Sequence, residues 1–229
     1  MPRVFISGAS KGIGLATAQR FLTAGYEVAI SASTEESLAA VQKQHPEIQI
    51  FRADMSNKSE VQALGQWIND SFGPLDILVN NVGRFIPGEL HKETDEAFEA
   101  TLHTNLFSNY YLTKAVLPAM MERKTGDIFN ICSTASIMAY PNGGSYCISK
   151  FALLGFSKVL REEMKAYGIR VISVIPGATL TASWEGVDLP EERFMPAEDI
   201  ATAIFEAQQL SRRTVIEEIL LRPALGDLD

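Results

Sequence analysis

The chain has few of the features that mark secreted, membrane or disulfide-stabilised proteins. Its 229 residues include only two cysteines, too few for a disulfide framework, and no apolar run reaches the roughly 20 residues of a membrane-spanning helix. Cys132 and Cys147 both lie among apolar residues, which predicts reduced core thiols and a cytoplasmic location. The first residues lead directly into a short apolar segment, without the basic and long apolar regions of a secretory signal.

Basic clusters and metal-ligand spacings are also lacking. The net charge is −8, and no run of Lys and Arg is long enough to follow a phosphate backbone, so we expect no nucleic acid and no membrane as partners. The three histidines, His45, His91 and His103, do not have the spacing of metal ligands, and we expect no metal. Arg212 and Arg213 are interpreted as a solvated basic pair at a helix end.

Short apolar strands alternate with helical segments along the whole chain. The expected strands are residues 4–7, 28–30, 48–51, 75–79, 128–131, 171–175 and 215–221, with helices between them that include 35–44, 94–123, 145–167 and 196–211. This alternation predicts parallel βαβ units with right-handed crossovers. The expected fold class is α/β: a single-domain, doubly wound, seven-stranded parallel sheet with helices on both faces, a Rossmann fold spanning residues 1–229.

Three glycines follow the first expected strand and open the first expected helix. Gly8 permits a sharp turn, Gly12 lets the backbone approach a pyrophosphate, and Gly14 lets helix and strand pack closely. The spacing differs from the commonest dinucleotide fingerprint, and the glycines alone are compatible with a simple tight turn. The strand before them and the helix after them favour a nucleotide site.

The tip of the second strand predicts which nicotinamide cofactor is bound. A carboxylate there would favour the free ribose hydroxyl of NAD(H), but Ser33 and Thr34 occupy the tip, and Lys11 lies in the glycine turn. We therefore expect NADP(H), with Lys11 reaching the 2′-phosphate. The alternative is that Lys11 is only solvated and that Glu35 turns inward, which favours NAD(H).

Tyr146 and Lys150 are four residues apart in a segment that predicts a buried helix, which places both side chains on one face. A phenol has a pKa near ~10 and is a poor acid or base at neutral pH unless a neighbouring cation stabilises its ionised form. By itself this pair is most often a helix face with a solvated lysine. Ser133, thirteen residues before Tyr146, lies where a preceding strand ends and offers a hydroxyl to a carbonyl oxygen.

Together these segments resemble the short-chain dehydrogenase/reductase family over nearly the whole chain, and in general terms its NADP-dependent 3-oxoacyl-carrier-protein reductases and carbonyl reductases. The matching motifs are residues 7–14, Asp54-Met55, residues 80–83, Asn105, Ser133, Tyr146 with Lys150, and residues 176–181. Ser7 replaces the family's usual Thr, and Val82 replaces its usual Ala. The order of the motifs is more specific than any one of them.

The resemblance implies a set of site residues. Tyr146 is the expected general acid and base, Lys150 lowers its pKa and binds the nicotinamide ribose, Ser133 binds the carbonyl oxygen, and Asn105 holds a proton-relay water. The implied cofactor-binding residues are Gly8, Ser10, Lys11, Gly12, Ile13, Gly14, Ser33, Asp54, Met55, Asn81, Gly83, Tyr146, Lys150, Pro176, Gly177, Thr179 and Thr181.

The implied activity is hydride transfer between NADP(H) and a small to medium carbonyl compound or secondary alcohol. A segment at about 179–195, with Trp184 and Phe194, is expected to cover the substrate, while Phe85, Met138 and Tyr140 either line the pocket or cover core. A homo-oligomer, tetramer or dimer, is expected by analogy. Two alternatives stay open: an NAD-dependent alcohol or sugar dehydrogenase, and a regulator that senses NADP(H) without catalysis.

Overall fold

A parallel sheet forms the centre of the molecule, in a computed structural model that describes residues 1–182, 186 and 188–227. Its strands are β1 (Arg3–Ile6), β2 (Glu27–Ala32), β3 (Gln49–Arg52), β4 (Ile77–Asn80), β5 (Gly126–Ile131), β6 (Ile169–Pro176) and β7 (Glu218–Leu221). They lie in the order β3-β2-β1-β4-β5-β6-β7, and every pairing is parallel. The predicted seven-stranded Rossmann sheet is confirmed, with β7 at one edge.

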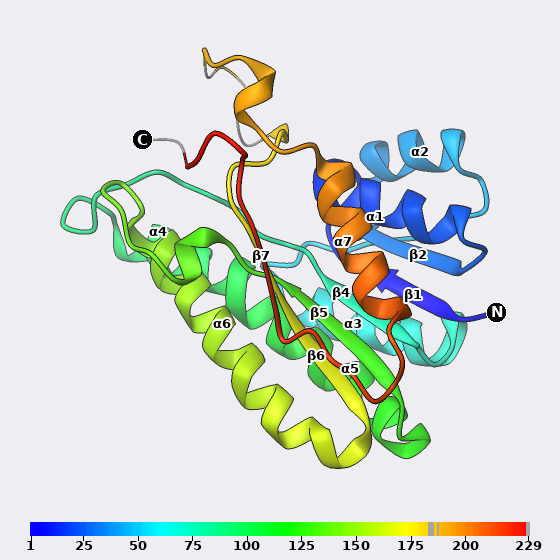
Figure 1. Cartoon of the computed structure of the whole chain (residues 1–229). Coiled ribbons are helices and arrows are strands. Elements are labelled where there is room, and N and C mark those ends of the chain that lie inside the picture. Colours follow the sequence, from blue (N-terminus) through cyan, green and yellow to red (C-terminus); the bar gives the residue numbers. More distant parts are fainter. Residues whose placement is uncertain (183–185, 187, 228–229) are drawn as a thin grey trace.

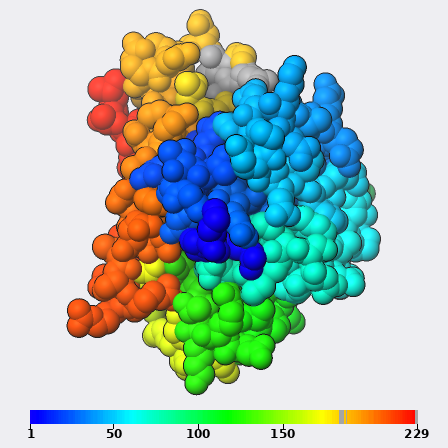
Figure 2. All heavy atoms as spheres, turned by 90° about the vertical axis from the view of Figure 1, so that its right-hand side faces the viewer, coloured from blue at the N-terminus to red at the C-terminus, as the bar shows by residue number. Residues whose placement is uncertain are grey.

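Two layers of helices cover the sheet (Figure 1). The helices are α1 (Gly12–Thr23), α2 (Glu35–Gln44), α3 (Lys58–Trp67), α4 (Asp95–Leu102), α5 (Ser108–Arg123), α6 (Gly144–Met164) and α7 (Ala197–Gln209). One apolar cluster joins α1, α2 and α7 to the sheet, and a second joins α3, α5 and α6 to its other face. Figure 2 shows the N-terminal residues, in blue, between the orange C-terminal part and the cyan residues of the β3–β4 region.

The capping residues explain where several helices begin. Thr34 accepts a hydrogen bond from the Ser37 amide at the start of α2, and Asn57 and Thr94 have the same role for α3 and α4. By contrast, α1 begins without a side-chain cap and without an acidic residue in its first turn. The amides at the start of α1 are therefore left available for an anion.

The long helix expected over 94–123 is divided into α4 and α5 by a π-helical turn, His103–Phe107. Side chains take up the backbone carbonyls there: Ser108 Oγ donates to Thr104 O at 2.5 Å, and Asn109 Nδ2 donates to Asn105 O at 2.8 Å. The regular pattern of the helix is thereby interrupted at Asn105. Single π turns inside helices are frequent at functional sites.

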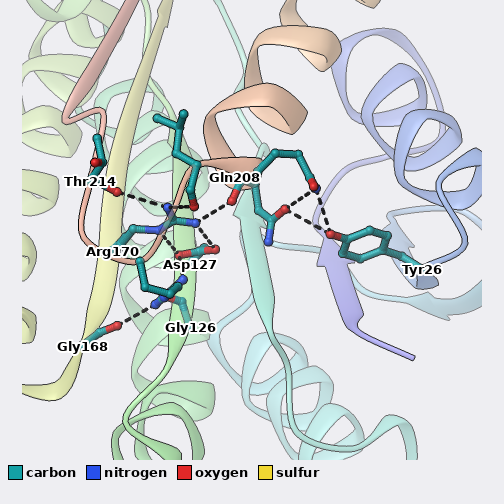
Figure 3. A network of polar contacts seen from close by, with 10 residues as sticks. Tyr26, Gly126, Asp127, Gly168, Arg170, Gln208 and Thr214 are labelled. Atoms are coloured by element: carbon teal, nitrogen blue, oxygen red, sulfur yellow. Dashed lines mark hydrogen bonds and ion pairs between the residues drawn. The ribbon is translucent and has the colours of Figure 1, made fainter.

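An ion-pair network closes the N-terminal end of the sheet (Figure 3). Asp127 and Arg170 are cross-strand neighbours on β5 and β6, and both Asp127 carboxylate oxygens accept from Arg170, at 2.7 and 2.8 Å. Arg212 also donates to Asp127, at 2.6 Å, and to the carbonyl of Gly168. The interpretation of Arg212 as a solvated cation is therefore wrong, because a long-range ion pair cannot be seen in local sequence.

No helix in the described part of the chain has the length and apolarity that crossing a membrane requires.

Candidate active site

The order of the strands reverses between β1 and β4, and in doubly wound sheets ligands bind beyond the carboxyl ends of the strands at such a point. The predicted glycine turn lies here. Gly8 has φ +63°, and a Cβ on it would lie 2.7 Å from Val82 Cγ2; a Cβ on Gly14 would lie 2.8 Å from the Gly8 carbonyl oxygen. Glycine is therefore required at both positions, because atoms of Val82 and of the turn itself fill the space that a Cβ would take.

Asn81 joins the glycine turn to the end of β4. Its Nδ2 donates to the carbonyls of Ser7 and Gly8, at 3.0 and 2.9 Å, and its backbone amide donates to Ser7 Oγ at 3.0 Å. The Asn81 side chain is thus hydrogen-bonded within the protein, and the expected binding of the cofactor at Asn81 stays a prediction. Ser7, which stands where the family usually has Thr, supplies the hydroxyl that this junction requires.

The residues expected around the adenosine half lie at the ends of β2 and β3. Lys11 and Ser33 are exposed, and Met55 is buried. The Asp54 carboxylate accepts from the side chain and amide of Ser56, and these hydrogen bonds lower the pKa of Asp54. Asp54 is therefore held ionised in a fixed turn, with its second oxygen not engaged by a described residue.

Ser133 begins a short 3₁₀ turn, Thr134–Ser136, directly after β5. Its Oγ accepts from the Ala135 amide at 3.1 Å, while Ser136 Oγ accepts from the Ser133 amide at 3.2 Å. This reciprocal capping box fixes the Ser133 side chain. Ser136 is 1% exposed, which indicates a structural loop serine rather than a second hydroxyl for substrate.

Tyr146 and Lys150 lie in the first turns of α6, as the spacing predicts. Lys150 is 3% exposed; its Nζ donates to the Ile131 carbonyl at 2.8 Å and lies 5.8 Å from the centroid of the Tyr146 ring. A Cβ on Gly83 would lie 2.9 Å from the same Nζ, so glycine is required where the loop after β4 passes the lysine. The structure brings Ser133, Tyr146 and Lys150 to one place at the end of β5.

The ionisation of the pair follows from its burial. Burial lowers the pKa of Lys150 to about 8, because the ammonium loses water and, among the residues that the structure describes, gains no carboxylate partner. Burial also raises the pKa of Tyr146, and the hydrogen bond with the Ser133 side chain acts in the opposite direction. Burial is the largest effect on the pKa of Tyr146, and Lys150 donates its hydrogen bond to Ile131, so the expected lowering of this pKa by Lys150 stays a prediction.

Asn105 connects the π turn, the loop after β4 and the helix of Tyr146. Its Oδ1 accepts from the Arg84 amide at 2.8 Å, and its Nδ2 donates to the Arg84 carbonyl at 3.0 Å and to Ser149 Oγ at 2.9 Å. Asn105 is fully buried. Its side chain therefore holds the Arg84 backbone beside α6, and its backbone carbonyl accepts from Asn109. That Asn105 holds a proton-relay water stays a prediction.

Residues 176–181 return to the same end of the sheet. Thr179 Oγ1 donates to the Gly177 carbonyl at 3.0 Å, and a Cβ on Gly12 would lie 3.1 Å from Thr181 Cγ2. Residues 177–182 and 188–195 extend beyond the carboxyl ends of the strands (Figure 1). Phe194 is 8% exposed, and Trp184, the other aromatic residue expected to cover substrate, lies outside the described residues.

Aromatic and apolar side chains surround Tyr146. Phe85 meets the Tyr146 ring edge-on, with centroids 5.0 Å apart, and Phe85, Met138 and Tyr140 are each more than a third exposed. Such large apolar side chains are left exposed at a binding site more often than elsewhere. Phe85 thus packs on the Tyr146 ring, and the expectation that Met138 and Tyr140 line the same apolar mouth stays a prediction.

Sequence reasoning missed Glu93. Its two carboxylate oxygens accept from the Ser145 amide, each at 3.1 Å, so that a loop residue caps α6. Gly88 pairs with Gly143 beside it, and a Cβ on Gly144 would overlap Glu93 Oε1. The signal in the sequence is the pair Gly143-Gly144, which offers no side-chain cap where the helix begins.

Comparison with known proteins identifies this arrangement. A family model described as short chain dehydrogenase matches residues 2–191. The chain belongs to the short-chain dehydrogenase/reductase family. It is 35% identical to the sepiapterin reductase of Chlorobaculum tepidum over 98% of this chain and 97% of that protein. It is 33% identical to the 3-oxoacyl-[acyl-carrier-protein] reductase of Haemophilus influenzae over 87% of each.

A solved structure extends the likeness. The closed form of serine dehydrogenase complexed with NADP⁺ superposes with a TM-score of 0.89 and 28% identity, over 99% of this chain and 96% of that one. The chain is an oxidoreductase of the short-chain dehydrogenase/reductase family, and structural neighbours of it bind NADP.

Proposed function

We propose that the protein is an NADPH-dependent reductase of small to medium ketones or aldehydes, running reversibly with the corresponding secondary alcohols. The observation that carries this proposal is the convergence of Ser133, Tyr146 and Lys150 at the end of β5, with Ser133 hydrogen-bonded to the phenol. The capping box of Ser133 and the burial of Lys150 support a fixed reacting geometry.

The glycine turn and the start of α1 fit a dinucleotide. The positive φ of Gly8 turns the chain sharply before α1, and the uncapped amides of α1 supply hydrogen bonds to a pyrophosphate. Gly83 leaves the space beside Lys150 Nζ through which a ribose hydroxyl is reached. NADPH supplies the hydride when it is bound.

The remaining steps belong to the chain. Ser133 Oγ donates to the carbonyl oxygen of the substrate and stabilises the negative charge that develops there. The Tyr146 hydroxyl donates its proton to that oxygen, and accepts it in the reverse direction. Lys150 Nζ stabilises the ionised phenol electrostatically after the proton has left, and Asn105 keeps the loop at Arg84 in place beside them.

The deciding experiment compares Tyr146→Phe with Tyr140→Phe in an NADPH-oxidation screen over ketones, aldehydes, quinones, pterins and 3-oxoacyl thioesters. Loss of the proton donor in Tyr146→Phe is expected to lower kcat roughly 10²- to 10⁴-fold with NADPH binding retained. Tyr140, exposed at the same mouth, provides the matched control, and its variant is expected to keep most of the turnover. Near wild-type turnover in Tyr146→Phe refutes the role.

The same screen separates the two alternatives. Oxidation of alcohols with NAD⁺, at a kcat/KM above that for NADP⁺, favours an NAD-dependent dehydrogenase. NADPH binding without turnover of any carbonyl favours a regulator. The retained Ser133, Tyr146 and Lys150 support the reductase over a regulator, which has no use for a fixed proton donor.

The proposed enzyme is a cytoplasmic homo-oligomer, a tetramer or a dimer. The exposed face of α6 supports the oligomer. Ile148, Phe151 and Val159 are each at least 40% exposed and lie on one stripe of the helix, with open space at Gly155 between them. A second copy of the same stripe would cover these side chains, and light scattering of the purified protein tests this.

A further inference from the structure

Arg52 ends β3 directly beside the tip of β2. It is in register with Ala32, the last residue of β2, and its Nε donates to the Ser33 carbonyl at 3.1 Å. The guanidinium therefore lies against the segment where a doubly wound fold meets the adenosine ribose. Lys11, in the glycine turn, is the other exposed cation assigned to this part of the site.

Glu60 of α3 fixes the direction of the Arg52 side chain. Its Oε2 accepts from Arg52 Nη1 at 2.6 Å and from the Asp54 amide at 2.8 Å. One carboxylate oxygen thus holds both the guanidinium and the turn that begins at Asp54. Of the five N–H groups of an arginine, those on Nη2 are not engaged by any residue in the described ranges.

We propose that Arg52 is a specificity-determining residue that binds the 2′-phosphate of NADPH together with Lys11. The proposal rests on the proposed function and assigns its choice of cofactor to a residue on β3. Guanidinium N–H groups match phosphate oxygens in a two-point arrangement, which a lysine cannot reproduce. Arg52 is also pre-oriented by Ser33 and Glu60, so that little side-chain freedom is lost on binding.

The charges around Arg52 explain why its side chain matters for binding the phosphate. Glu35 and Glu36 are exposed in the first turn of α2, next to Ser33 and Thr34 at the tip of β2. Their carboxylates oppose a doubly charged phosphate in a chain that is already acidic. Glu60 offsets part of the charge of Arg52, so Arg52 contributes chiefly the N–H donors on its Nη2, and Lys11 contributes the positive charge that is unpaired among the described residues.

The test measures binding and needs no carbonyl substrate. Calorimetric titration compares adenosine 2′,5′-bisphosphate with 5′-AMP, two probes that differ only in the 2′-phosphate. The wild-type protein is expected to bind the bisphosphate more tightly. Because hydrogen bonds to a charged group are lost, Arg52→Met is expected to weaken bisphosphate binding roughly 10- to 100-fold and leave 5′-AMP binding unchanged. Lys43→Met, an exposed charge removed at the far end of α2, is the matched control and changes neither affinity.

Three outcomes overturn the proposal. If Arg52→Met loses the same affinity for both probes, the residue contributes to adenosine binding in general. If Arg52→Met keeps its affinity for the bisphosphate while Lys11→Met loses it, Lys11 alone binds the phosphate. A wild-type protein without preference for the bisphosphate refutes NADP(H) selectivity itself, while reductase chemistry is still judged by Tyr146→Phe. Arg52→Lys, which keeps the charge without the Nε donor to Ser33, is expected to fall between wild type and Arg52→Met, and melting curves establish that each variant is folded.

Discussion

The two ends of the sheet use polar residues in opposite ways. At the N-terminal end, Arg170 donates to Asp127 and to the carbonyls of Gln208, Leu210 and Thr214 (Figure 3). Every nitrogen of this buried guanidinium has a partner. At the C-terminal end, the amides that begin α1 have no side-chain cap, and Lys150 is buried without a carboxylate.

The contrast separates structure from function in this molecule. Groups that satisfy one another contribute stability and offer nothing to a ligand, whereas groups that are buried and only partly satisfied cost stability and remain available for binding. A hollow at this end is lined in part by Arg170 and Arg212, whose guanidinium groups already donate to Asp127 and to backbone carbonyls. We therefore assign chemistry to the other end of the sheet.

Breaking the N-terminal network is expected to have the largest effect on stability. Asp127→Asn removes the carboxylate from Arg170, which is 7% exposed, and leaves a buried cation without its counter-charge. The free energy of unfolding is expected to fall by about 3–5 kcal/mol, measured by urea denaturation. Binding of adenosine 2′,5′-bisphosphate to the fraction that is folded is expected to stay unchanged.

Arg213→Ala is the matched control for that variant. Arg213 is next to Arg212, is exposed, and forms no ion pair or hydrogen bond with the residues that the structure describes. Its removal is expected to change the free energy of unfolding by less than about 0.5 kcal/mol. Equal losses in Arg213→Ala and Asp127→Asn would contradict a specific network at this end.

Burying Lys150 lowers the stability of the folded chain by an amount that depends on pH. Burial lowers the pKa of Lys150 from 10.5 to about 8, so between these values the unfolded chain binds a proton that the folded chain does not. Stability then rises with pH across that window, by at most roughly 3 kcal/mol. Urea denaturation at several pH values is expected to show this rise in wild type relative to Lys150→Met.

Lys158 provides the opposite case. It is exposed, and its hydrogen bond with Glu218 raises its pKa, so both the folded and the unfolded chain hold its proton through most of the same window. The difference in unfolding free energy between wild type and Lys158→Met is expected to stay nearly constant with pH. If the difference between wild type and Lys150→Met also stays constant with pH, burial does not lower the pKa of Lys150 in the folded chain.

Local sequence predicted the parts of the fold and site that depend on short-range order. The apolar strands, the glycine turn and the spacing of Tyr146 and Lys150 all gave expectations that the structure confirms in position. Contacts between distant segments were missed. The pairing of Arg212 with Asp127 spans 85 residues, and nothing near either residue indicates the other.

The same limit applies at the site. Asn105 was expected from its motif, but its hold on Arg84 and Ser149 depends on how three segments pack. Arg52 could be read only as the end of an edge strand until the register of β2 and β3 placed it at Ser33. The pattern of side chains along one segment predicts its element, whereas partners across the fold come from topology.

The smallest predicted effect concerns the cap of α6, where a structural contact lies within the functional end. Glu93→Ala removes the acceptor of the Ser145 amide and is expected to lower the free energy of unfolding by about 1 kcal/mol, as for loss of a helix cap. Glu93→Gln keeps a neutral acceptor, and its free energy of unfolding is expected to fall by only a few tenths of a kcal/mol. Glu99→Ala, an exposed carboxylate on α4, is the control.

Hydrogen exchange distinguishes a local cap from general destabilisation. If Glu93 holds the first turn of α6, the amides of Ser145 and Tyr146 exchange faster in Glu93→Ala, while those in the middle of β5 do not. Faster exchange in β5 as well would mean that the whole domain opens, and unchanged exchange at Ser145 would mean that another group caps the helix. Faster exchange confined to Ser145 and Tyr146 would show that the Glu93 carboxylate and the Ser145 amide hold the turn that carries Tyr146. The functional end of the sheet would then also depend on a purely structural hydrogen bond.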